Sequence, residues 1–541
     1  MSAGAGAAAG AAADAHGTTG AHGTTGTTRV TAHRGDSSAH RENTLEAVQA
    51  ALDAGVPTIE VDVRLTRDGE VVVLHDETVE RLWGDPRAVA AMSAADVRAL
   101  GGPGLRVPTL AEVLALVDGT GSVLLVDLAD PRPAVAAAAV VARHPGPARV
   151  AWCGDHDALR VVRAADPDAV LWQPWSRADP PTAADLVELG PAVVNLPHLL
   201  VGPRLVAALH ELGVLVACWT VDDVVQARRL AAVGVDLVTT NRPGEVAAAL
   251  ADDRPLDADE ERARQRTVAR ALAAWAVDHV RRHPVEHVEA KADAADLVTE
   301  VDREIELGVR AVVAAQFPDH AFVGEELGGD GRADVPCWYL DPVDGTANLA
   351  AGVPWTSFSL ALVVDGEPVV GVVADPWRDV VVDAVAGGGA WSGGRRLRLG
   401  DGAGPGSGPR ASSGEHRLGD PLRGRVVSTE LAGHRPWPGM LELLDGLAAR
   451  FCTLRIMGSG TLTVAGIALG HGAGAVVGTF GPVDHLAACL IVREAGGAVL
   501  DEAGRDTLFP ASGGVLAARD RGTAVALHAL WTAARREHAR S

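Results

Sequence analysis

The stretch that decides the fold of this chain is Leu340-Asp341-Pro342-Val343-Asp344-Gly345-Thr346-Ala347-Asn348-Leu349. It places two carboxylates three residues apart at the end of an apolar run. A carboxylate that leaves a buried strand is costly unless a partner such as a hard divalent cation offsets its desolvation. Gly345 lets the backbone approach a ligand closely, and a helix beginning at Thr346 would direct free N–H groups at an anion. The alternative is an Asp-rich surface turn, because short Asp/Gly motifs are common in turns.

Separate segments carry further chemical groups at the ends of predicted elements. Upstream, Glu325 ends a short predicted strand, and Lys291 precedes a segment that contains Asp302. Downstream, Asp484 opens the predicted helix His485–Ala495. Carboxylates from several elements, together with a lysine and a hydroxyl, suit a site that binds magnesium ions and a phosphate.

In their order and in their residues, these segments resemble the inositol monophosphatase family over residues 263–541. The resemblance implies a layered α/β (αβαβα) domain that uses Mg²⁺ to hydrolyse a phosphomonoester of the inositol monophosphate type. It implies that the metal ligands are Glu325, Asp341, the Val343 carbonyl, Asp344 and Asp484. It implies catalytic roles, in positioning and activating the attacking water, for Asp302, Thr346 and Glu325. Members of this family are often dimers, so a homodimer through this domain is expected.

The substrate side of this predicted site is assembled from several loops. By the resemblance, Gly345 and Thr346 hold the phosphate through backbone N–H groups, and Lys291 lies beside metal-bound waters. Gly458 and Ser459 precede a predicted helix whose N-terminus would line the substrate pocket.

Lys291 is the only lysine among the 48 basic residues counted as Lys and Arg. Arginine therefore serves wherever a generic positive charge suffices. The retained lysine falls where the family places one, and a compact ammonium is not interchangeable there with a planar guanidinium. The alternative is that a single lysine falls there by chance.

Two positions depart from the family pattern. Family members that recognise inositol carry a glutamate shortly before the last metal aspartate, where this chain has Gly478. The usual tryptophan before that aspartate is Val483. The metal ligands are intact, so the phosphate chemistry is expected to remain, while the preference for inositol is left open. The alternative substrate is another monophosphate, such as histidinol phosphate, a sugar phosphate or a nucleotide 3′-phosphate.

Between residues 29 and 250, strand-like apolar runs alternate with helical stretches rich in Ala, Leu and Arg. The runs are Arg29–Arg34, Thr58–Leu65, Ser122–Leu128, Arg149–Cys153, Ala169–Trp172, Ala192–Leu196, Val214–Trp219 and Leu237–Thr240. This alternation predicts a (β/α)8 TIM barrel, whose active site lies at the C-terminal ends of its strands.

Polar side chains follow these strands at those ends. His33 ends the first run, and Glu60 and Asp62 lie two apart on the second, so both point to the same side. His75 follows the next short run, and Asp127 ends the third barrel strand. Two histidines with three carboxylates suit acid–base cleavage of a metal-held phosphodiester. The alternative for each histidine alone is a satisfied, partly buried side chain.

A resemblance to the glycerophosphodiester phosphodiesterase family covers residues 29–250 and rests on His33-Arg34-Gly35, Glu60-Val61-Asp62 and Leu74-His75-Asp76. It implies that His33 and His75 are the catalytic acid–base pair and that Arg34 contacts phosphate. A divalent cation, Mg²⁺ or Ca²⁺, would be held by Glu60, Asp62 and Asp127. The family usually has Glu, Lys and Asp where this chain has Asp127, Ala129 and Asn241. The missing lysine leaves open a barrel that is a weak or non-catalytic binding module.

Composition limits the classes of partner. The 541 residues carry a formal net charge of −22, which argues against nucleic acid or an anionic membrane and for small phosphorylated substrates received through metal ions. No apolar run is long enough to span a bilayer, and the first residues do not have the pattern of a signal peptide. The five cysteines lie far apart, as in a reducing compartment, so a cytoplasmic location is expected.

The sequence divides into four predicted regions. Residues 1–28 are a low-complexity tail expected to be disordered, 29–250 form the barrel, 251–262 are a charged linker and 263–541 are the phosphatase-like domain. Within the last region, Ala263–Arg282 is a predicted helix and Gly400–Gly414 a glycine-rich loop.

Overall fold

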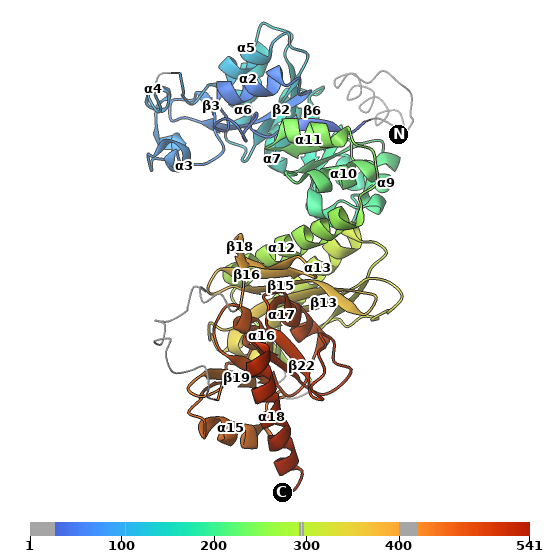
Figure 1. Cartoon of the computed structure of the whole chain (residues 1–541). Helices are drawn as coiled ribbons and strands as arrows, with labels where there is room; N and C mark the ends of the chain where they lie inside the picture. Colours follow the sequence, from blue (N-terminus) through green and yellow to red (C-terminus); the bar gives the residue numbers. More distant parts are fainter. Residues whose placement is uncertain (1–26, 103, 292–293, 295–296, 400–419) are drawn as a thin grey trace. The chain divides into compact units, whose positions relative to one another are not determined.

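The computed structural model describes residues 27–102, 104–291, 294, 297–399 and 420–541. Most of the predicted tail (residues 1–26) and the predicted loop Gly400–Gly414 lie outside the described residues. The chain forms two compact units, Met1–Asp257 and Ala258–Ser541 (Figure 1).

The N-terminal unit is a closed barrel of parallel strands. In its described residues the strand order is β1-β9-β8-β7-β6-β5-β4-β2, and β1 also pairs with β2, which closes the ring. The strands are β1 (Arg29–Ala32), β2 (Thr58–Leu65), β4 (Val123–Leu128), β5 (Arg149–Gly154), β6 (Val170–Pro174), β7 (Val193–Pro197), β8 (Leu215–Trp219) and β9 (Leu237–Thr240). A short strand, β3 (Val71–Val73), pairs antiparallel with β2. The prediction of a (β/α)8 barrel is confirmed.

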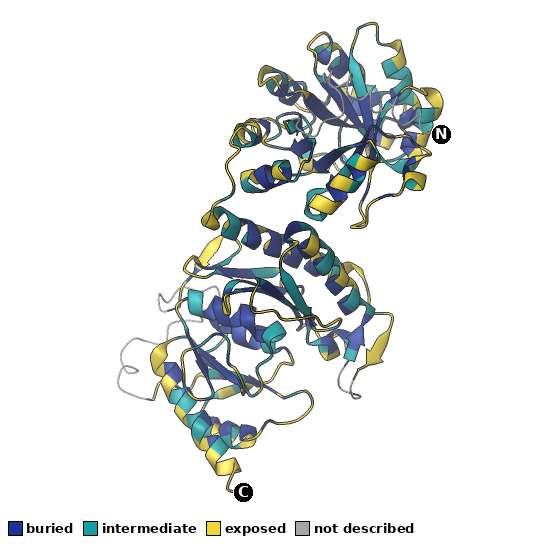
Figure 2. Cartoon of the chain, turned by 90° about the vertical axis from the view of Figure 1, so that its right-hand side faces the viewer, coloured by how far each residue is buried: buried dark blue, intermediate teal, exposed yellow. Residues whose placement is uncertain are grey.

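Helices lie between the barrel strands and shield them from solvent. They are α2 (Leu45–Asp53), α3 (Glu80–Trp83), α4 (Ala94–Arg98), α5 (Leu110–Val117), α6 (Ala134–Arg143), α7 (His156–Ala165), α8 (Ala183–Leu186), α9 (Pro203–Glu211), α10 (Val224–Ala232) and α11 (Pro243–Leu250), with 3-10 turns η1 (Val89–Ala91) and η2 (His198–Leu200). Figure 2 shows buried strands inside helices whose outer faces are exposed. Leu125, Trp172 and Ala217 belong to a buried cluster contributed by the strands themselves, so the barrel is packed and not a pore.

The C-terminal unit begins with helix α12 (Ala258–Arg282). The helix predicted at Ala263 therefore starts five residues earlier, and residues 258–262 of the predicted linker form its first turns. Its first turn holds Asp259, Glu260 and Glu261, and acidic side chains at a helix N-terminus are stabilised by the exposed N–H groups and the helix dipole.

The C-terminal unit is layered. Its described residues form a seven-stranded sheet in the order β12-β13-β14-β15-β16-β17-β18 and a five-stranded sheet in the order β20-β19-β21-β23-β22. In the first sheet the strands are β12 (Ala321–Gly324), β13 (Cys337–Asp344), β14 (Ser357–Val364), β15 (Glu367–Asp375), β16 (Val380–Val385), β17 (Gly389–Ser392) and β18 (Arg395–Leu397). In the second they are β19 (Val426–Glu430), β20 (Thr453–Arg455), β21 (Gly474–Val477), β22 (Ala498–Asp501) and β23 (Val515–Ala518).

Helices form the other layers of this unit (Figure 1). Besides α12 they are α13 (Glu300–Gln316), α14 (Thr346–Ala350), α15 (Met440–Ala448), α16 (Gly460–Ala468), α17 (Pro482–Glu494) and α18 (Arg521–His538); β10 (Val288–Ala290) and β11 (Leu297–Thr299) form a hairpin. In Figure 1, α16 and α17 lie between the two sheets, α12 and α13 cover the first sheet, and α15 and α18 cover the second. The predicted αβαβα layering is confirmed.

Helix α17 is buried on all sides because it lies between two sheets. Its residues His485 to Val492 are all buried. A Cβ on Gly371 of β15 would come within 2.9 Å of the Ala487 Cα, so only a glycine allows the helix to lie this close to the sheet. Within the described part of the chain, no helix is both long and apolar enough to cross a membrane.

Two candidate active sites

Three carboxylates meet at the C-terminal ends of neighbouring barrel strands. Glu60 and Asp62 lie on β2, and Asp127 lies on β4 in direct parallel register with Asp62. Each offers an oxygen atom within 4.8 Å of the others, and Glu60 and Asp62 are buried. The side-chain period of a strand places Glu60 and Asp62 on one face, as predicted.

The electrostatics of this group favour a bound cation. Burial, with the nearby Asp62 and Asp127, raises the pKa of Glu60 well above its usual range. Burial and Asp62 raise the pKa of Asp127 to about 6. A set of carboxylate oxygens that repel one another at this separation fits Mg²⁺ or Ca²⁺, which offset both the repulsion and the desolvation.

Arg34 lies among these carboxylates. Its backbone adopts a positive φ of 61°, and its N–H donates to Glu60 over 2.9 Å. Its guanidinium donates to Glu42 Oε1 (2.8 Å) and lies 3.1 Å from Asp62 Oδ2. Asn43 Nδ2 also donates to Asp62, over 2.7 Å. The turn after β1 therefore fixes both carboxylates of β2.

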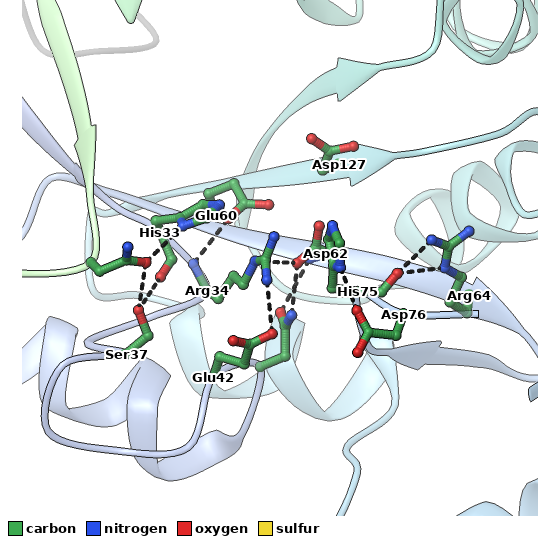
Figure 3. Close-up of polar contacts among 12 residues, drawn as sticks. His33, Arg34, Ser37, Glu42, Glu60, Asp62, Arg64, His75, Asp76 and Asp127 are labelled. Carbon is green, nitrogen blue, oxygen red and sulfur yellow. Dashed lines mark hydrogen bonds and ion pairs between the residues drawn. The ribbon is translucent and has the colours of Figure 1, made fainter. Parts of the chain in front are cut away.

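The two predicted catalytic histidines have different partners (Figure 3). His33 Nδ1 lies 2.8 Å from Asn241 Oδ1, and its Nε2 lies 3.9 Å from Glu60 Oε2. Burial, together with Arg34, lowers the pKa of His33. His75 Nδ1 lies 2.7 Å from Asp76 Oδ1, and Arg81 pairs with the other Asp76 oxygen at 2.6 Å.

A second acidic group lies in the C-terminal unit. Gly324 at the end of β12 is in parallel register with Leu340 of β13, which places Glu325 beside Asp341. Asp484, in the first turn of α17, completes the group, and each residue offers an oxygen within 4.8 Å of the others. Burial and the neighbouring carboxylates raise the pKa of Asp341 well above its usual range, and burial raises the pKa of Asp484 to about 6. These oxygens fit Mg²⁺ as the barrel's do.

Asp344 and the Val343 carbonyl lie beside this group but have protein partners. Asp344 Oδ2 accepts hydrogen bonds from the Ser459 hydroxyl (2.5 Å) and the Thr461 N–H (2.7 Å). The Val343 carbonyl oxygen lies 3.0 Å from the Thr346 hydroxyl. Each still has an oxygen lone pair for a cation.

Thr346 and Asp302 form a buried pair next to the carboxylates. Thr346 Oγ1 lies 3.2 Å from Asp302 Oδ1, and the Thr299 N–H donates to the other Asp302 oxygen over 2.9 Å. Gly345 has a φ of 92°, and a Cβ there would come within 2.8 Å of the Gly458 carbonyl oxygen. The loop after β13 and the loop before α16 therefore touch at two glycines.

The remaining predicted substrate residues have partners within the protein. Lys291 Nζ lies 2.9 Å from both Glu325 Oε1 and Glu326 Oε1. The Gly458 N–H donates to Glu430 over 2.8 Å, while the Ser459 hydroxyl donates to Asp344. In the structure, Gly458 and Ser459 thus hold the site's backbone and a carboxylate in place.

The inositol monophosphatase family model matches residues 257–539. The chain belongs to the inositol monophosphatase family. Residues 33–245 match a second model, the glycerophosphoryl diester phosphodiesterase family. Both families are hydrolytic enzymes, so the chain is a hydrolase with two phosphoesterase domains.

Individual relatives match one half of the chain or the other. Inositol monophosphatase 2 of Solanum lycopersicum is 34% identical over 235 residues, which is 41% of this chain and 80% of that protein. An inositol-1-monophosphatase of Synechocystis is 32% identical over 223 residues, 40% of this chain and 70% of that protein. A solved phosphodiesterase of Oleispira antarctica is 24% identical and covers 41% of this chain and 97% of its own, with a TM-score of 0.39.

This member of the inositol monophosphatase family has a filled space at Gly478. A Cβ on Gly478 would come within 2.1 Å of Trp437 Cγ, so the indole occupies the volume of any side chain at this position. Trp437 is buried, and its Nε1 donates to the Glu430 carbonyl over 3.0 Å. A cavity of about 440 Å³ lies beside Gly478, since the neighbouring Val477 and Thr479 line it. Leu431 and Ile456 line it as well, and it reaches Asp344 and Asp484.

Arg64 is a site residue that sequence reasoning missed. Its Nε donates to the His75 carbonyl over 2.8 Å, and its Nη1 pairs with Asp130 at 3.1 Å. Glu60, Asp62 and Arg64 are alternate residues of β2, so they share a face. The alternation of Glu60, Asp62 and Arg64 is the sequence signal that could have identified Arg64. Arg64 brings a positive charge to the end of β2, two residues beyond Asp62.

Proposed function

We propose that the C-terminal domain hydrolyses a phosphomonoester of the inositol monophosphate type with Mg²⁺. The observation that carries the proposal is the group of Glu325, Asp341 and Asp484 beside the buried Thr346–Asp302 pair. Asp341, Asp344, Asp484, Glu325 and the Val343 carbonyl are the proposed ligands. When bound, magnesium would supply positive charge for the phosphoryl oxygens and make a nearby water more acidic.

The protein's own groups have distinct proposed roles in this reaction. Thr346 orients the attacking water, and Asp302 accepts its proton through the Thr346 hydroxyl. The N–H groups of Gly345 and Thr346 hold the phosphate, while Lys291 balances the negative charge of Glu325. Water adds to phosphorus as its proton passes through the Thr346 hydroxyl to Asp302. The ester P–O bond breaks, the leaving alkoxide takes up a proton from solvent water, and the alcohol and inorganic phosphate leave.

We propose that the barrel hydrolyses a glycerophosphodiester to a phosphomonoester and an alcohol. Glu60, Asp62 and Asp127 would hold Mg²⁺ or Ca²⁺, and Arg34 would contact a phosphate oxygen. His33 and His75 would be the acid–base pair, which fits their places at the carboxylate group: His33 Nε2 lies 3.9 Å from Glu60 Oε2, and His75 lies close enough to Asp127 to interact with its charge (Figure 3). The two reactions would act in series when the diester's monophosphate product is the phosphatase substrate, as for a glycerophosphoinositol.

Phosphorus NMR of the full chain with glycerophosphoinositol and Mg²⁺ tests both proposals. Inositol phosphate that appears and then gives way to free phosphate is the expected result. The Asp341→Asn variant should stop at the monophosphate, and the His75→Ala variant should leave the diester intact while still hydrolysing added inositol 1-phosphate. An untouched diester in the wild-type chain would overturn the proposal for the barrel. Resistance of inositol 1-phosphate would overturn the proposed substrate type.

One observation favours a second candidate for the phosphatase substrate. Trp437 fills the space at Gly478, where the family resemblance leads us to expect a glutamate, and the nearby cavity presents Leu431, Ile456 and Val477 beside its acidic end. The second candidate is another monophosphate, such as histidinol phosphate or a sugar phosphate. Higher kcat/KM on such a compound than on inositol 1-phosphate would select it.

We also propose a homodimer through the phosphatase domain and a cytoplasmic location. The five cysteines all lie in described residues and are free, which supports a reducing compartment. Sedimentation equilibrium at several protein concentrations tests the dimer, since a constant monomer mass would exclude it. Fractionation of the source cells tests the location.

A further inference from the structure

The side-chain amide of Asn241 links the predicted catalytic His33 to a second carboxylate, Asp222. His33 follows β1, Asn241 follows β9 and Asp222 follows β8, so three strand ends meet at this amide. Asn241 Oδ1 lies 2.8 Å from His33 Nδ1, and Asn241 Nδ2 donates to Asp222 Oδ2 over 2.7 Å. None of the proposed steps in the barrel yet uses Asn241 or Asp222.

Asp222 determines which end of the amide faces His33. An ionised carboxylate only accepts hydrogen bonds, so it must face the NH₂ end of Asn241. Asp222 is itself held, because its Oδ1 accepts from the Asn241 backbone N–H (2.8 Å) and from Thr240 Oγ1 (2.9 Å). The carbonyl end of the amide therefore points at His33. Ser37 Oγ, 2.9 Å from the same Asn241 oxygen, is placed to donate to it as well.

This orientation fixes the tautomer of the neutral imidazole. An amide oxygen can only accept, so Nδ1 must carry the proton and Nε2 keeps its lone pair. Nε2 faces the carboxylate site, 3.9 Å from Glu60 Oε2, where a proton acceptor is needed (Figure 3). The opposite amide orientation would place a donor against Nδ1 and move the proton to Nε2.

We propose that Asp222 and Asn241 are positioning residues that hold His33 in its Nδ1–H tautomer, so that Nε2 accepts a proton from the attacking oxygen. The inference rests on the proposed diester cleavage by the barrel. In that step the attacking oxygen bonds to phosphorus as its proton passes to Nε2, and the ester P–O bond breaks as the leaving oxygen takes up a proton from His75.

An amide needs this external orientation, whereas a carboxylate does not. An aspartate at position 241 would present an acceptor whichever way it turned. An asparagine presents an acceptor or a donor, and Asp222 selects between them. This predicts a specific dependence between the two positions.

The Asp222→Asn variant tests the inference without changing the size of a side chain. Its Oδ1 can still accept from the Asn241 backbone N–H and from Thr240, which leaves an NH₂ group where Asp222 Oδ2 stood. Asn241 must then turn its oxygen toward Asn at 222 and its NH₂ toward His33. The expected result is the Nε2–H tautomer, with the diesterase kcat lowered at least about tenfold and KM nearly unchanged.

The Asp222→Asn/Asn241→Asp double variant should restore both the tautomer and the rate. It exchanges the two side chains, conserves net charge and again presents an acceptor to His33 Nδ1. A purely structural role for Asp222 gives no reason for rescue by a second substitution. Asp223→Ala is the matched control. Asp223 follows Asp222 directly and caps α10, and among the described residues it has no hydrogen bond to Asn241.

The tautomer is read in the full chain labelled with ¹⁵N-histidine, with the His33→Gln spectrum identifying the His33 signals. A single Nδ1–H tautomer that persists in Asp222→Asn would overturn the inference, as would a double variant as slow as the single one. If the wild-type chain does not cleave the diester, the proposed function fails, and the ¹⁵N signals of wild type, single and double variants still decide whether Asp222 and Asn241 set the tautomer.

Discussion

The indole of Trp437 lies against the backbone of Gly478, so close that a Cβ on Gly478 would come within 2.1 Å of the ring. We therefore expect Gly478→Glu, which introduces the residue that the family resemblance leads us to expect there, to lower the free energy of unfolding by about 1–3 kcal/mol, because the side chain overpacks a filled space. Urea unfolding measures the loss. Gly522→Ala in α18 is the control and should be neutral or stabilising, because an added Cβ would meet only Asp520 Oδ1, at an ordinary contact distance of 3.4 Å.

The same pair of residues tests which alcohol the phosphatase prefers. Removing the indole in Gly478→Glu/Trp437→Ala opens room for the glutamate near the cavity that reaches Asp344 and Asp484. We expect the double variant to gain activity on inositol 1-phosphate relative to a sugar phosphate. An unchanged ratio of the two kcat/KM values would show that the side chains at positions 437 and 478 do not select the substrate.

Asp341→Asn should separate stability from activity. Burial and three nearby carboxylates raise the pKa of Asp341, so its charged form opposes folding when no cation is present. We expect the variant to melt at a higher temperature than wild type in EDTA, to lose the stabilisation by Mg²⁺, and to lose phosphatase activity. Differential scanning calorimetry with and without Mg²⁺ measures the first two effects. The exposed Asp319→Asn should match wild type, and a lower melting temperature for Asp341→Asn in EDTA would contradict the argument.

The stability of the metal-free chain should depend on Asp484 between about pH 4 and pH 6. Burial raises the pKa of Asp484 to about 6, so the folded state binds a proton more tightly than the unfolded state. Its contribution is complete below the unfolded pKa and is lost as pH rises through the folded pKa. Urea unfolding in EDTA across this range should show wild type losing stability relative to Asp484→Asn. If the free energy of unfolding changed with pH equally in wild type and in Asp484→Asn, the raised pKa of Asp484 would be refuted.

Arg64→Met should affect the barrel alone. The substitution removes the hydrogen bond to the His75 carbonyl and the ion pair with Asp130. We expect the diesterase kcat to fall about 10- to 100-fold, because His75 is no longer held in place, while phosphatase activity stays unchanged. Assays of both activities on one preparation measure this. Arg67→Met, an exposed arginine nearby, should leave both rates at wild-type values.

Local sequence patterns were sufficient for the barrel and for most of its carboxylates. Strands of alternating residues place Glu60 and Asp62 on one face, and parallel strand ends bring Asp127 to them. The sequence predicts the start of α12 five residues too late. Its acidic first turn has the composition of a charged linker, but the same charge also stabilises a helix N-terminus.

Contacts between distant segments could not be found in the sequence in the same way. His33 and Asn241 lie 208 residues apart, and Ser459 and Asp344 lie 115 apart. Trp437 follows β19 and fills the space over Gly478, which follows β21, and a single sequence does not reveal which bulky residue occupies the space left by a missing side chain. Such pairs depend on how elements pack and not on any period along the chain.

The burial of α17 between two sheets has a mechanical consequence for Asp484. A carboxylate on a surface loop can swing away by local fraying, but the first turn of α17 leads into residues that are buried from His485 to Val492. Withdrawing that helix would expose the apolar faces of both sheets at once, so its amide hydrogens should exchange only when the whole domain unfolds. The third carboxylate of the site therefore moves with the domain as a single rigid body.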